Sequence, residues 1–375
     1  MVETHSKFQR IERLMPLAEA LACIDRLIHV HPISITPAAS SRTYGVTLAK
    51  DVTAPHARPS GARALRDGAA VRAEATLDAN SYAPVKIEAV EVEVGDPLPA
   101  GTDAVAPAEM LEFRGDAVYA LAPLAPGDGV LPDGADGGAG DLLYPVGTHV
   151  RAVDLAVLEV LAPDTQSIRQ PEVSVASAHP KGDRVAAAIQ DMLISAIHAA
   201  GSRAFKPSPD LIGLDAVRLA SSGLIVVGGS GTGRRDRSVR DLAERGRVAF
   251  HGVGIAPGET AAFGMIEDKP VLVVPARIDA ALAAWVTLGR RMLARLGGRT
   301  DTEACGTSVT LNRKIASTLG MVELVPVVRE RDGVVPLASG YLPPQALARS
   351  HGYVLVPAES EGFAAGTRVE MRPWP

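Results

Sequence analysis

Between residues 171 and 298, short apolar runs alternate with longer segments in which apolar positions recur every three or four residues. The short runs are typical of buried strands and the longer segments of amphipathic helices. The predicted strands are 173–176, 224–227 and 271–274, and the predicted helices are 184–200, 238–245 and 279–296. This alternation predicts an α/β domain with a mainly parallel sheet, whose ligands bind beyond the carboxyl ends of the strands.

The pattern differs on both sides of this region. Residues 16–28 place apolar side chains on one helical face, and residues 151–161 predict another short helix, which could pack against the first. From about 50 to 145, short alternating segments such as 85–94 lie between Pro and Gly clusters, which predicts a small β domain. The tail returns to short strands at 321–328, 353–356 and 367–371.

The chain is therefore predicted to be an α/β multidomain protein. We expect a discontinuous helical region, an inserted β domain, an α/β domain and a C-terminal β module. Their predicted bounds are 1–48 with 146–170, 49–145, 171–300 and 301–375. A length of 375 residues is too great for one ordinary core, which agrees with this division.

Composition excludes several classes of protein. The net charge of -5 gives no general basic field, which argues against a nucleic-acid binder. Cys23 and Cys305 are far apart and lack metal-ligand spacing, so we expect two buried thiols. The N-terminus has no apolar signal region, and no uncharged apolar stretch reaches 18 residues, so we expect a cytoplasmic protein that does not bind membranes.

The predicted strand 224–227 runs into Gly228, Gly229, Ser230, Gly231, Thr232 and Gly233, and a helix follows. Free backbone N–H groups and the helix dipole at such a junction favour an anion, so phosphate is the expected ligand. A tight strand-to-helix turn is the alternative. Ser238 with Asp241 predicts a capping-box variant at the helix start, and Asp236 is either a site residue or a helix cap.

Several local strings carry a more specific likeness. Residues 94–105 read VGDPLPAGTDAV, and Glu109 follows; residues 126–148 run from Pro-Gly through Gly134 and Asp136 to Gly-Thr; and Asp67-Gly68 precedes an Ala-Val pair. With the 228–236 loop, these strings resemble the molybdenum insertase family of molybdenum-cofactor biosynthesis, the bacterial MoeA proteins and the gephyrin E domain. The likeness extends over nearly the whole chain.

The departures from the family pattern lie at positions that would face substrate. The family's Lys-Pro-Gly-Lys-Pro stands here as residues 256–260, APGET, so Ala256 and Glu259 replace two lysines. Leu131 stands in place of a family arginine, and segments 177–183 and 273–278 are rewritten. Exchanging a substrate-facing lysine for Glu259 turns attraction into repulsion, worth about 4 kcal/mol at ~4 Å and an effective dielectric of ~20, before solvent screening.

The resemblance implies a homodimer whose cleft lies between the β domain of one chain and the α/β domain of the other. It implies transfer of molybdate to adenylylated molybdopterin, assisted by Mg²⁺, with a molybdoenzyme as a possible client. The implied catalytic residues are Asp67, Asp136 and Asp236, with Asp67 and Asp236 as metal ligands. The implied cofactor-binding residues are Gly228, Gly229, Ser230, Gly231, Thr232, Gly233, Arg234, Pro257, Gly258 and Pro275.

Cations for the anionic substrate are expected near the cleft, and the candidates are Lys181, Arg184, Arg234, Arg235 and Arg277. Three functions remain open: an insertase, a non-catalytic molybdopterin carrier or assembly factor without the lysines, and an enzyme acting on another phosphorylated substrate. Some single residues also have an alternative interpretation. Asp67 could be a turn residue, and Asp133 or Asp141, rather than Asp136, could be the functional aspartate of its loop. His179 is either structural or functional.

Overall fold

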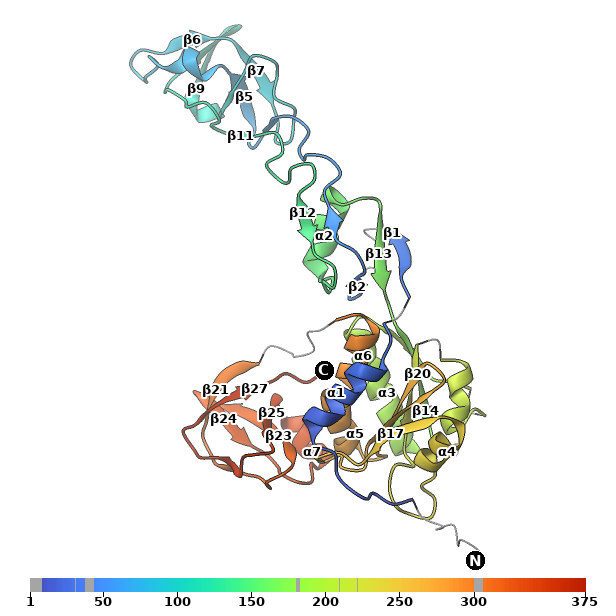
Figure 1. Cartoon of the computed structure of the whole chain (residues 1–375). Coiled ribbons are helices and arrows are strands. Elements are labelled where there is room, and N and C mark those ends of the chain that lie inside the picture. The colour runs from blue at the N-terminus through green and yellow to red at the C-terminus, as the bar shows by residue number, and fades with distance from the viewer. Residues whose placement is uncertain are drawn as a thin grey trace, which may run out of the picture.

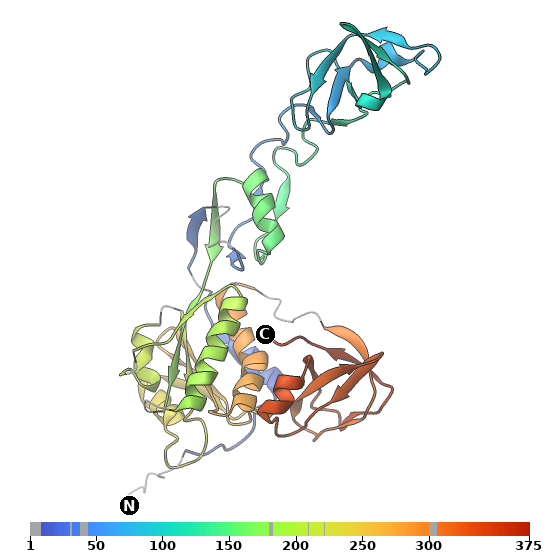
Figure 2. The ribbon, with the colours of Figure 1, turned by 180° about the vertical axis from the view of Figure 1, so that it is seen from behind.

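The computed structural model describes residues 9–30, 32–37, 44–179, 183–208, 210–220, 222–299 and 306–375. The molecule is elongated, as Figures 1 and 2 show from opposite sides. An α/β part and a C-terminal β part form the body, a small β domain lies at the far end, and a narrow stem connects them. The expected mixed α/β protein with several sheets is confirmed.

The main sheet has the order β15-β14-β16-β20-β19-β17. The first four strands are parallel, while β19 and β17 join as an antiparallel edge that the sequence patterns did not predict. The bounds are β14 Glu172–Ser177, β15 Arg203–Phe205, β16 Gly223–Val227, β17 Arg247–His251, β19 Ala262–Ile266 and β20 Lys269–Val274. The residues of β16 are all buried, as expected for a strand covered on both faces.

Helices cover both faces of this sheet. Ile225 and Val227 lie in one core cluster with residues of α1, α3, α5 and α6, whereas Leu224 and Val226 lie in another with residues of α4 and η3. The bounds are α1 Leu17–Leu27, α3 Arg184–Ala199, η3 Gly213–Arg218, α4 Ser238–Arg245, α5 Ile278–Ala284 and α6 Arg290–Leu296. The two-residue alternation along each strand thus divides the core into two layers.

The predicted helix 279–296 contains a wider turn. A π-helical segment, η4 (Trp285–Gly289), separates α5 from α6. A Cβ atom at Gly289 would lie 2.4 Å from the ring of Trp285, so the indole packs where only glycine leaves room.

The first helix does not pack against the helix of the stem, so that expectation is wrong. Ala20, Cys23 and Ile24 of α1 bury in the body core, and α1 contacts α6 and η4. The stem helix α2 (Ala152–Leu161) instead buries Leu158 in a separate cluster. Cys23 is a buried free thiol, as predicted, and Cys305 lies outside the described residues.

The stem consists of strands that leave the body and return to it. β13 (Thr165–Arg169) pairs with β1 (Ser34–Pro37) and β2 (Thr47–Leu48), and β12 (Leu142–Tyr144) pairs with β3 (Val52–Thr53). The chain between β3 and β12 forms the distant β domain.

Three small sheets and two short 3-10 helices make up that domain. Their elements are β4 Arg63–Ala64, β5 Gly68–Val71, η1 Ala73–Thr76, β6 Val85–Ile87, β7 Ala89–Val92, β8 Ala104–Ala106, η2 Ala108–Met110, β9 Leu111–Arg114, β10 Ala117–Ala120 and β11 Val130–Leu131. The segment 85–94 is divided between two sheets, because β6 pairs with β10 whereas β7 pairs with β5.

The C-terminal part forms a sheet of order β18-β23-β24-β21-β27, with β25 against β23. β18 belongs to the chain of the α/β part, and Ile255 pairs with Val322, so the two parts are joined through backbone bonds. The elements are β18 Ile255–Ala256, β21 Thr307–Leu311, β22 Ile315–Ala316, β23 Val322–Glu330, β24 Gly333–Pro336, α7 Pro344–Arg349, β25 Gly352–Val356, β26 Gly362–Phe363 and β27 Arg368–Met371. Within the described ranges, every helix is too short or too polar to cross a membrane.

Candidate functional site

Three loops meet at the carboxyl edge of the parallel strands. The loops follow β14, β16 and β20, and backbone bonds connect them where the strands end. Ala178 N–H donates to the carbonyl of Val227 at 2.9 Å, and Gly228 N–H donates to that of Val274 at 2.8 Å. This is the edge at which parallel α/β sheets bind their ligands.

The loop after β16 depends on glycine at its first two positions. Gly228 has φ +97° and Gly229 has φ +74°, a region that other residues adopt only with strain. A Cβ atom at Gly228 would lie 2.5 Å from the ring of His179, and one at Gly229 would lie 2.2 Å from the hydroxyl of Ser238. The two glycines therefore let the chain turn between the neighbouring loop and the start of α4.

The loop is held mainly through its carbonyl groups. Ser238 Oγ donates to Gly228 O at 2.9 Å, and Gln9 Nε2 donates to Gly229 O at 2.8 Å and also to Gly231 O. His251 Nε2 donates to Ser230 O at 2.8 Å. These hydrogen bonds hold the loop backbone against the body of the protein.

The backbone N–H groups of Ser230, Gly231 and Thr232 donate to no acceptor in the described parts of the chain. Successive N–H groups without acceptors, next to a helix N-terminus, form a concave site for a phosphate oxygen. Gly231 and Thr232 lie toward solvent, whereas Ser230 is buried and its hydroxyl lies 3.0 Å from that of Thr260. The loop is thus prepared to bind an anion on its open side.

The predicted capping box at α4 is wrong. Ser238 is the first helical residue, and its hydroxyl bonds back to the glycine loop instead of capping the helix. Asp241 pairs with Arg237 at 3.5 Å. Ser238 bonds the buried carbonyl of Gly228 instead of the helix end, because a buried carbonyl without a hydrogen-bond partner is costly.

Asp236 shapes the loop. Its carboxylate accepts the N–H of Gly233 at 2.9 Å, and Asp236 N–H donates to Gly233 O, so the pair closes a tight turn. The alternative of a helix cap is excluded, since α4 begins after Arg237 without a side-chain cap. Arg234 and Arg235 are exposed on this turn.

An ion pair lies beside the glycine loop at the start of α5. The guanidinium of Arg277 donates to both carboxylate oxygens of Asp279, at 3.1 and 2.7 Å. Asp279 is buried and also accepts the N–H groups of Ala280 and Leu342. The two hydrogen bonds to Asp279 hold the guanidinium in place, and they also raise the pKa of Arg277, so it stays charged.

Arg277 faces a cavity of about 450 Å³. Its guanidinium lies 5.4 Å from the ring centre of Tyr341, and the cavity wall also includes His179 and Asp183, whose side chains approach to 3.5 Å. A planar cation over an aromatic ring can bind an oxyanion with its outward N–H groups.

Glu259 lies near this cation. Its charge contributes to the raised pKa of Arg277, and its carboxylate accepts the N–H of Gly258 at 3.0 Å. Gly258 has φ +119° and approaches the backbone of Ala280, so the 256–260 loop packs on the start of α5. Pro257 belongs to this 256–260 loop, and Pro275 lies in the loop between β20 and α5. The carboxylate that replaces a family lysine is therefore partly balanced by an arginine.

The acidic residues of the β domain lie far from this site in the same chain (Figure 1). Asp67 is exposed and accepts the N–H of Val94 at 2.8 Å, while Asp136 is exposed on the segment that leads back to the stem. Nowhere in the described ranges do three acidic, His or Cys side chains come together as a metal site would require. One chain does not unite the predicted metal ligands Asp67 and Asp236.

The remaining candidate residues are distributed as follows. Asp133 accepts Gly61 N–H, which connects two loops 72 residues apart, whereas Asp141 accepts Gly138 N–H within a local turn. Glu109 is exposed on η2. Arg184 begins α3, and Lys181 lies outside the described residues. The sequence patterns missed Gln9, His251, Thr260, Asp279 and Tyr341. Of these, only Asp279 could have been found from the sequence, because it lies two residues after the candidate cation Arg277.

Comparisons with known proteins show what this chain resembles. The family model described as the MoeA N-terminal region, domains I and II, matches residues 15–162. A Methanocaldococcus jannaschii protein named for molybdopterin biosynthesis is 26% identical, covering 86% of this chain and 88% of that protein. The molybdopterin molybdenumtransferase 2 of Mycobacterium tuberculosis is 24% identical, covering 88% and 93%.

Solved structures show the same fold. The crystal structure of the molybdopterin biosynthesis MoeA protein of Pyrococcus horikoshii superimposes with a TM-score of 0.74 at 25% identity, covering 97% of this chain and 100% of that one. A molybdenum cofactor biosynthesis protein of Pyrococcus furiosus gives a TM-score of 0.61 at 18% identity, covering 96% and 100%.

Proposed function

Because the chain belongs to the MoeA family, we propose that it acts in molybdenum-cofactor biosynthesis as a molybdopterin molybdenumtransferase. Its substrates are molybdopterin, in the adenylylated form, and molybdate, which is transferred to the dithiolene. The observation that carries this proposal is the glycine loop 228–233 at the carboxyl edge of the sheet, whose N–H groups at 230–232 have no acceptor among the described residues.

In this proposal each loop has a separate task. The N–H groups of the 230–232 backbone bind the terminal phosphate of molybdopterin, and Arg234 is exposed on the turn that follows them. Arg277 holds an oxyanion from the neighbouring cavity, with its position set by Asp279 and Tyr341. Pro257, Gly258 and Pro275 supply backbone walls.

Mg²⁺ was expected to assist the reaction, but the carboxylates of one chain do not form a site for it. A hard divalent cation requires several oxygen ligands in one place, and no such group occurs among the described residues. We therefore assign no step to a metal. Asp236 sets the turn of the glycine loop, and Asp67 and Asp136 reach substrate only if a second chain supplies them.

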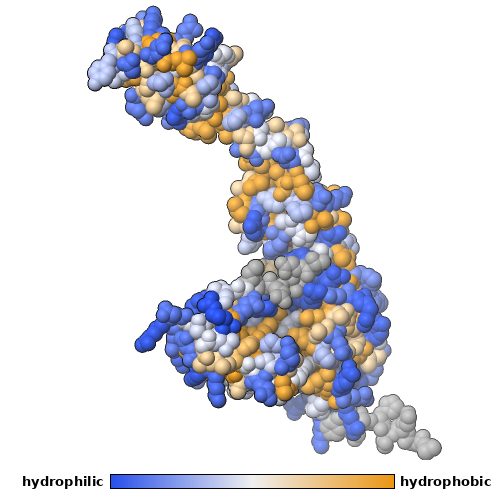
Figure 3. All heavy atoms as spheres, turned by 60° about the vertical axis from the view of Figure 1, so that its left-hand side comes forward, coloured by the Kyte–Doolittle hydropathy of each residue, from blue (hydrophilic) through white to orange (hydrophobic). Residues whose placement is uncertain are grey.

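A homodimer is accordingly part of the proposal. Apolar side chains are exposed along the stem, and Figure 3 shows such side chains gathered there. Ile35 is 75% exposed, Val153 60%, Leu142 58% and Val160 54%. Because a contiguous apolar surface is costly in water, a second chain is expected to cover it and to bring its β domain to the cleft. Light scattering that gives the mass of a single chain would exclude this dimer.

The enzymatic proposal is tested by incubating the full chain with adenylylated molybdopterin and molybdate, and by following nucleotide release and molybdenum incorporation. Both products are expected, and Arg277→Gln should slow their formation at least tenfold, while the exposed control Arg218→Gln should not. Binding without either product would instead establish the non-catalytic carrier. A cytoplasmic location and a molybdoenzyme client remain predictions.

A further inference from the structure

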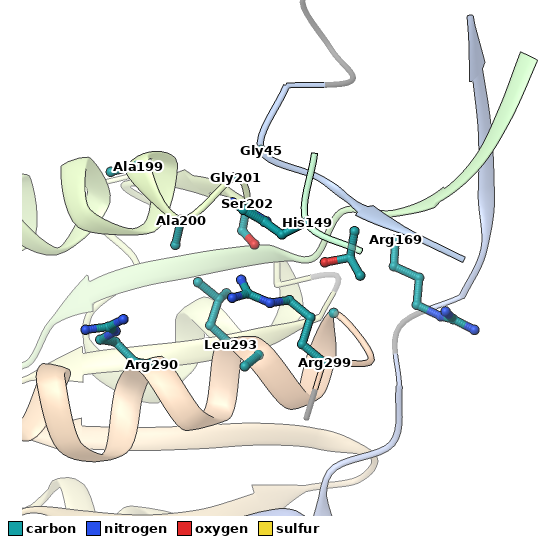
Figure 4. Close-up of a pocket in the computed structure, with 13 residues that line it drawn as sticks. Gly45, His149, Arg169, Ala199, Ala200, Gly201, Ser202, Arg290, Leu293 and Arg299 are labelled. Carbon is teal, nitrogen blue, oxygen red and sulfur yellow. The ribbon is translucent and has the colours of Figure 1, made fainter. Parts of the chain in front are cut away.

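A second cavity lies where the stem meets the body, away from the glycine loop (Figure 4). It measures about 200 Å³, enough for several water molecules or for a small hydrated ion, because water occupies about 30 Å³ in the liquid. Its walls come from both parts: residues 45, 47, 149 and 169 from the stem, and segments 199–202 and 290–299 from the body.

The walls of this cavity are basic. They include Arg169, Arg290, Arg299 and His149, and none of the described residues that form them is acidic. In Figure 4 the side chain of Arg299 extends from the end of α6 into the space beside the 199–202 turn, whereas those of Arg290 and Arg169 lie on opposite sides of it and extend outward. Thr47 and Ser202 add buried hydroxyl groups.

Two polar atoms at the cavity are left without a partner. The Nδ1 atom of His149 and the Nε atom of Arg169 are buried, and neither has a hydrogen-bond partner in the described chain. Buried polar atoms without partners are uncommon in folded proteins. The Nε–H of Arg169 lacks an acceptor, and Nδ1 of His149 lacks one when it carries the proton. Burial, and to a smaller extent the charge of Arg299, lowers the pKa of His149, and Asp154 opposes this weakly.

Capping of helix ends does not explain why His149 and Arg169 lie here with unpaired buried atoms. Both α3 and α6 end at this cavity, and a helix C-terminus attracts cations. However, Ser202 N–H donates to Ile197 O at 3.2 Å, and Arg299 N–H donates to Ala294 O at 2.8 Å, which are the backbone bonds of Schellman ends. The backbone thus satisfies these carbonyl groups without a side chain.

We propose that this cavity binds a tetrahedral oxyanion, of the size of phosphate or molybdate, between Arg299, Arg169 and His149. The site is separate from the glycine loop, because α3 runs back from the carboxyl edge and ends at the opposite edge of the sheet. A bound anion would connect two parts that already touch, since a Cβ atom at Gly201 would overlap the carbonyl of Gly45. It would thereby hold the stem, and the β domain beyond it, in one orientation.

The test uses the full chain, titrated with inorganic phosphate and, separately, with molybdate at constant ionic strength. Calorimetry measures affinity, and histidine-selective NMR follows His149, assigned with His149→Asn. We expect saturable binding that raises the pKa of His149, and at least tenfold weaker binding in Arg299→Gln and Arg169→Gln. Arg218→Gln, on the exposed surface of the body, is the control.

Phosphate and molybdate bound alike would define a general oxyanion site, and preference for molybdate would define a second site for that anion. The proposal is overturned if His149 does not respond to saturating anion, or if both arginine variants bind as the wild type does. Should either glutamine variant fail to fold, Arg169→Lys and Arg299→Lys keep the charge and are expected to retain binding. If no anion binds at this cavity, the proposed enzymatic function still stands, because nucleotide release and molybdenum incorporation test that function separately.

Discussion

Glu259 is the residue whose change should most improve substrate binding. It is half-buried and lies near Arg277, and the resemblance places it where the insertase family has a lysine. Glu259→Gln removes the charge but keeps an oxygen that accepts the N–H of Gly258. The loop should therefore hold its shape while its repulsion of an anionic ligand disappears.

The size of the effect follows from Coulomb's law. At ~8 Å from a ligand charge and an effective dielectric of ~20, one charge contributes about 2 kcal/mol. Partial exposure of Glu259 reduces this to about 1 kcal/mol, which corresponds to roughly fivefold tighter binding. The gain should shrink as salt is added, because salt screens the charge.

The assay is calorimetric titration of wild type and Glu259→Gln with molybdopterin at low and high ionic strength. Glu330→Gln, at the exposed end of β23, is the matched control and should bind as the wild type does. An unchanged or weaker affinity for Glu259→Gln at low salt would refute the placement of Glu259 beside the ligand.

Three further changes test other parts of the account. Asp67→Ala should lower the free energy of unfolding in urea by about 1 kcal/mol, because Asp67 accepts the N–H of Val94. The same variant should abolish nucleotide release. If nucleotide release is unchanged, Asp67 does not belong to the site. Asp279→Ala should lower the free energy of unfolding by about 2–3 kcal/mol, because it leaves Arg277 and the N–H groups of Ala280 and Leu342 without their acceptor. A loss below about 1 kcal/mol would contradict the proposed importance of this ion pair. The hydrogen bond from Arg151 lowers the pKa of buried Asp154, so ionised Asp154 stabilises the fold above about pH 4, and this contribution to the free energy of unfolding should be lost as pH falls further. In Asp154→Asn the urea midpoint should therefore fall less steeply with decreasing pH than in the wild type.

The sequence predicted the elements of the main sheet well because each has a strong local pattern. The runs around Ile225 and Leu272 are buried on both faces and have little polar content, which identifies them as central strands. Gly228 and Gly229 marked the loop, since their positive φ angles require glycine. Strand β17 begins with Arg247 and ends with His251, and the buried run of β19 is interrupted by Gly264, so neither was predicted as a strand.

Long-range partners could not be predicted from one sequence. Gln9 reaches Gly229 across 220 residues, and nothing near position 9 indicates such a contact. The packing of α1 was misjudged for the same reason, because an apolar face shows that a helix is covered but not by what. Ser238 was misjudged because a serine at a helix start usually caps it, whereas here the carbonyl of Gly228 lies within reach.

The central claim is that the 230–232 backbone holds the phosphate of molybdopterin, and one titration tests it directly. Thr232 is exposed at the open side of this loop, so Thr232→Glu adds a negative charge there without burying it. The control Thr307→Glu adds the same charge to an exposed position of β21. The account predicts saturable binding of molybdopterin by wild type and Thr307→Glu, and at least tenfold weaker binding by Thr232→Glu. Equal affinity in all three proteins would contradict it.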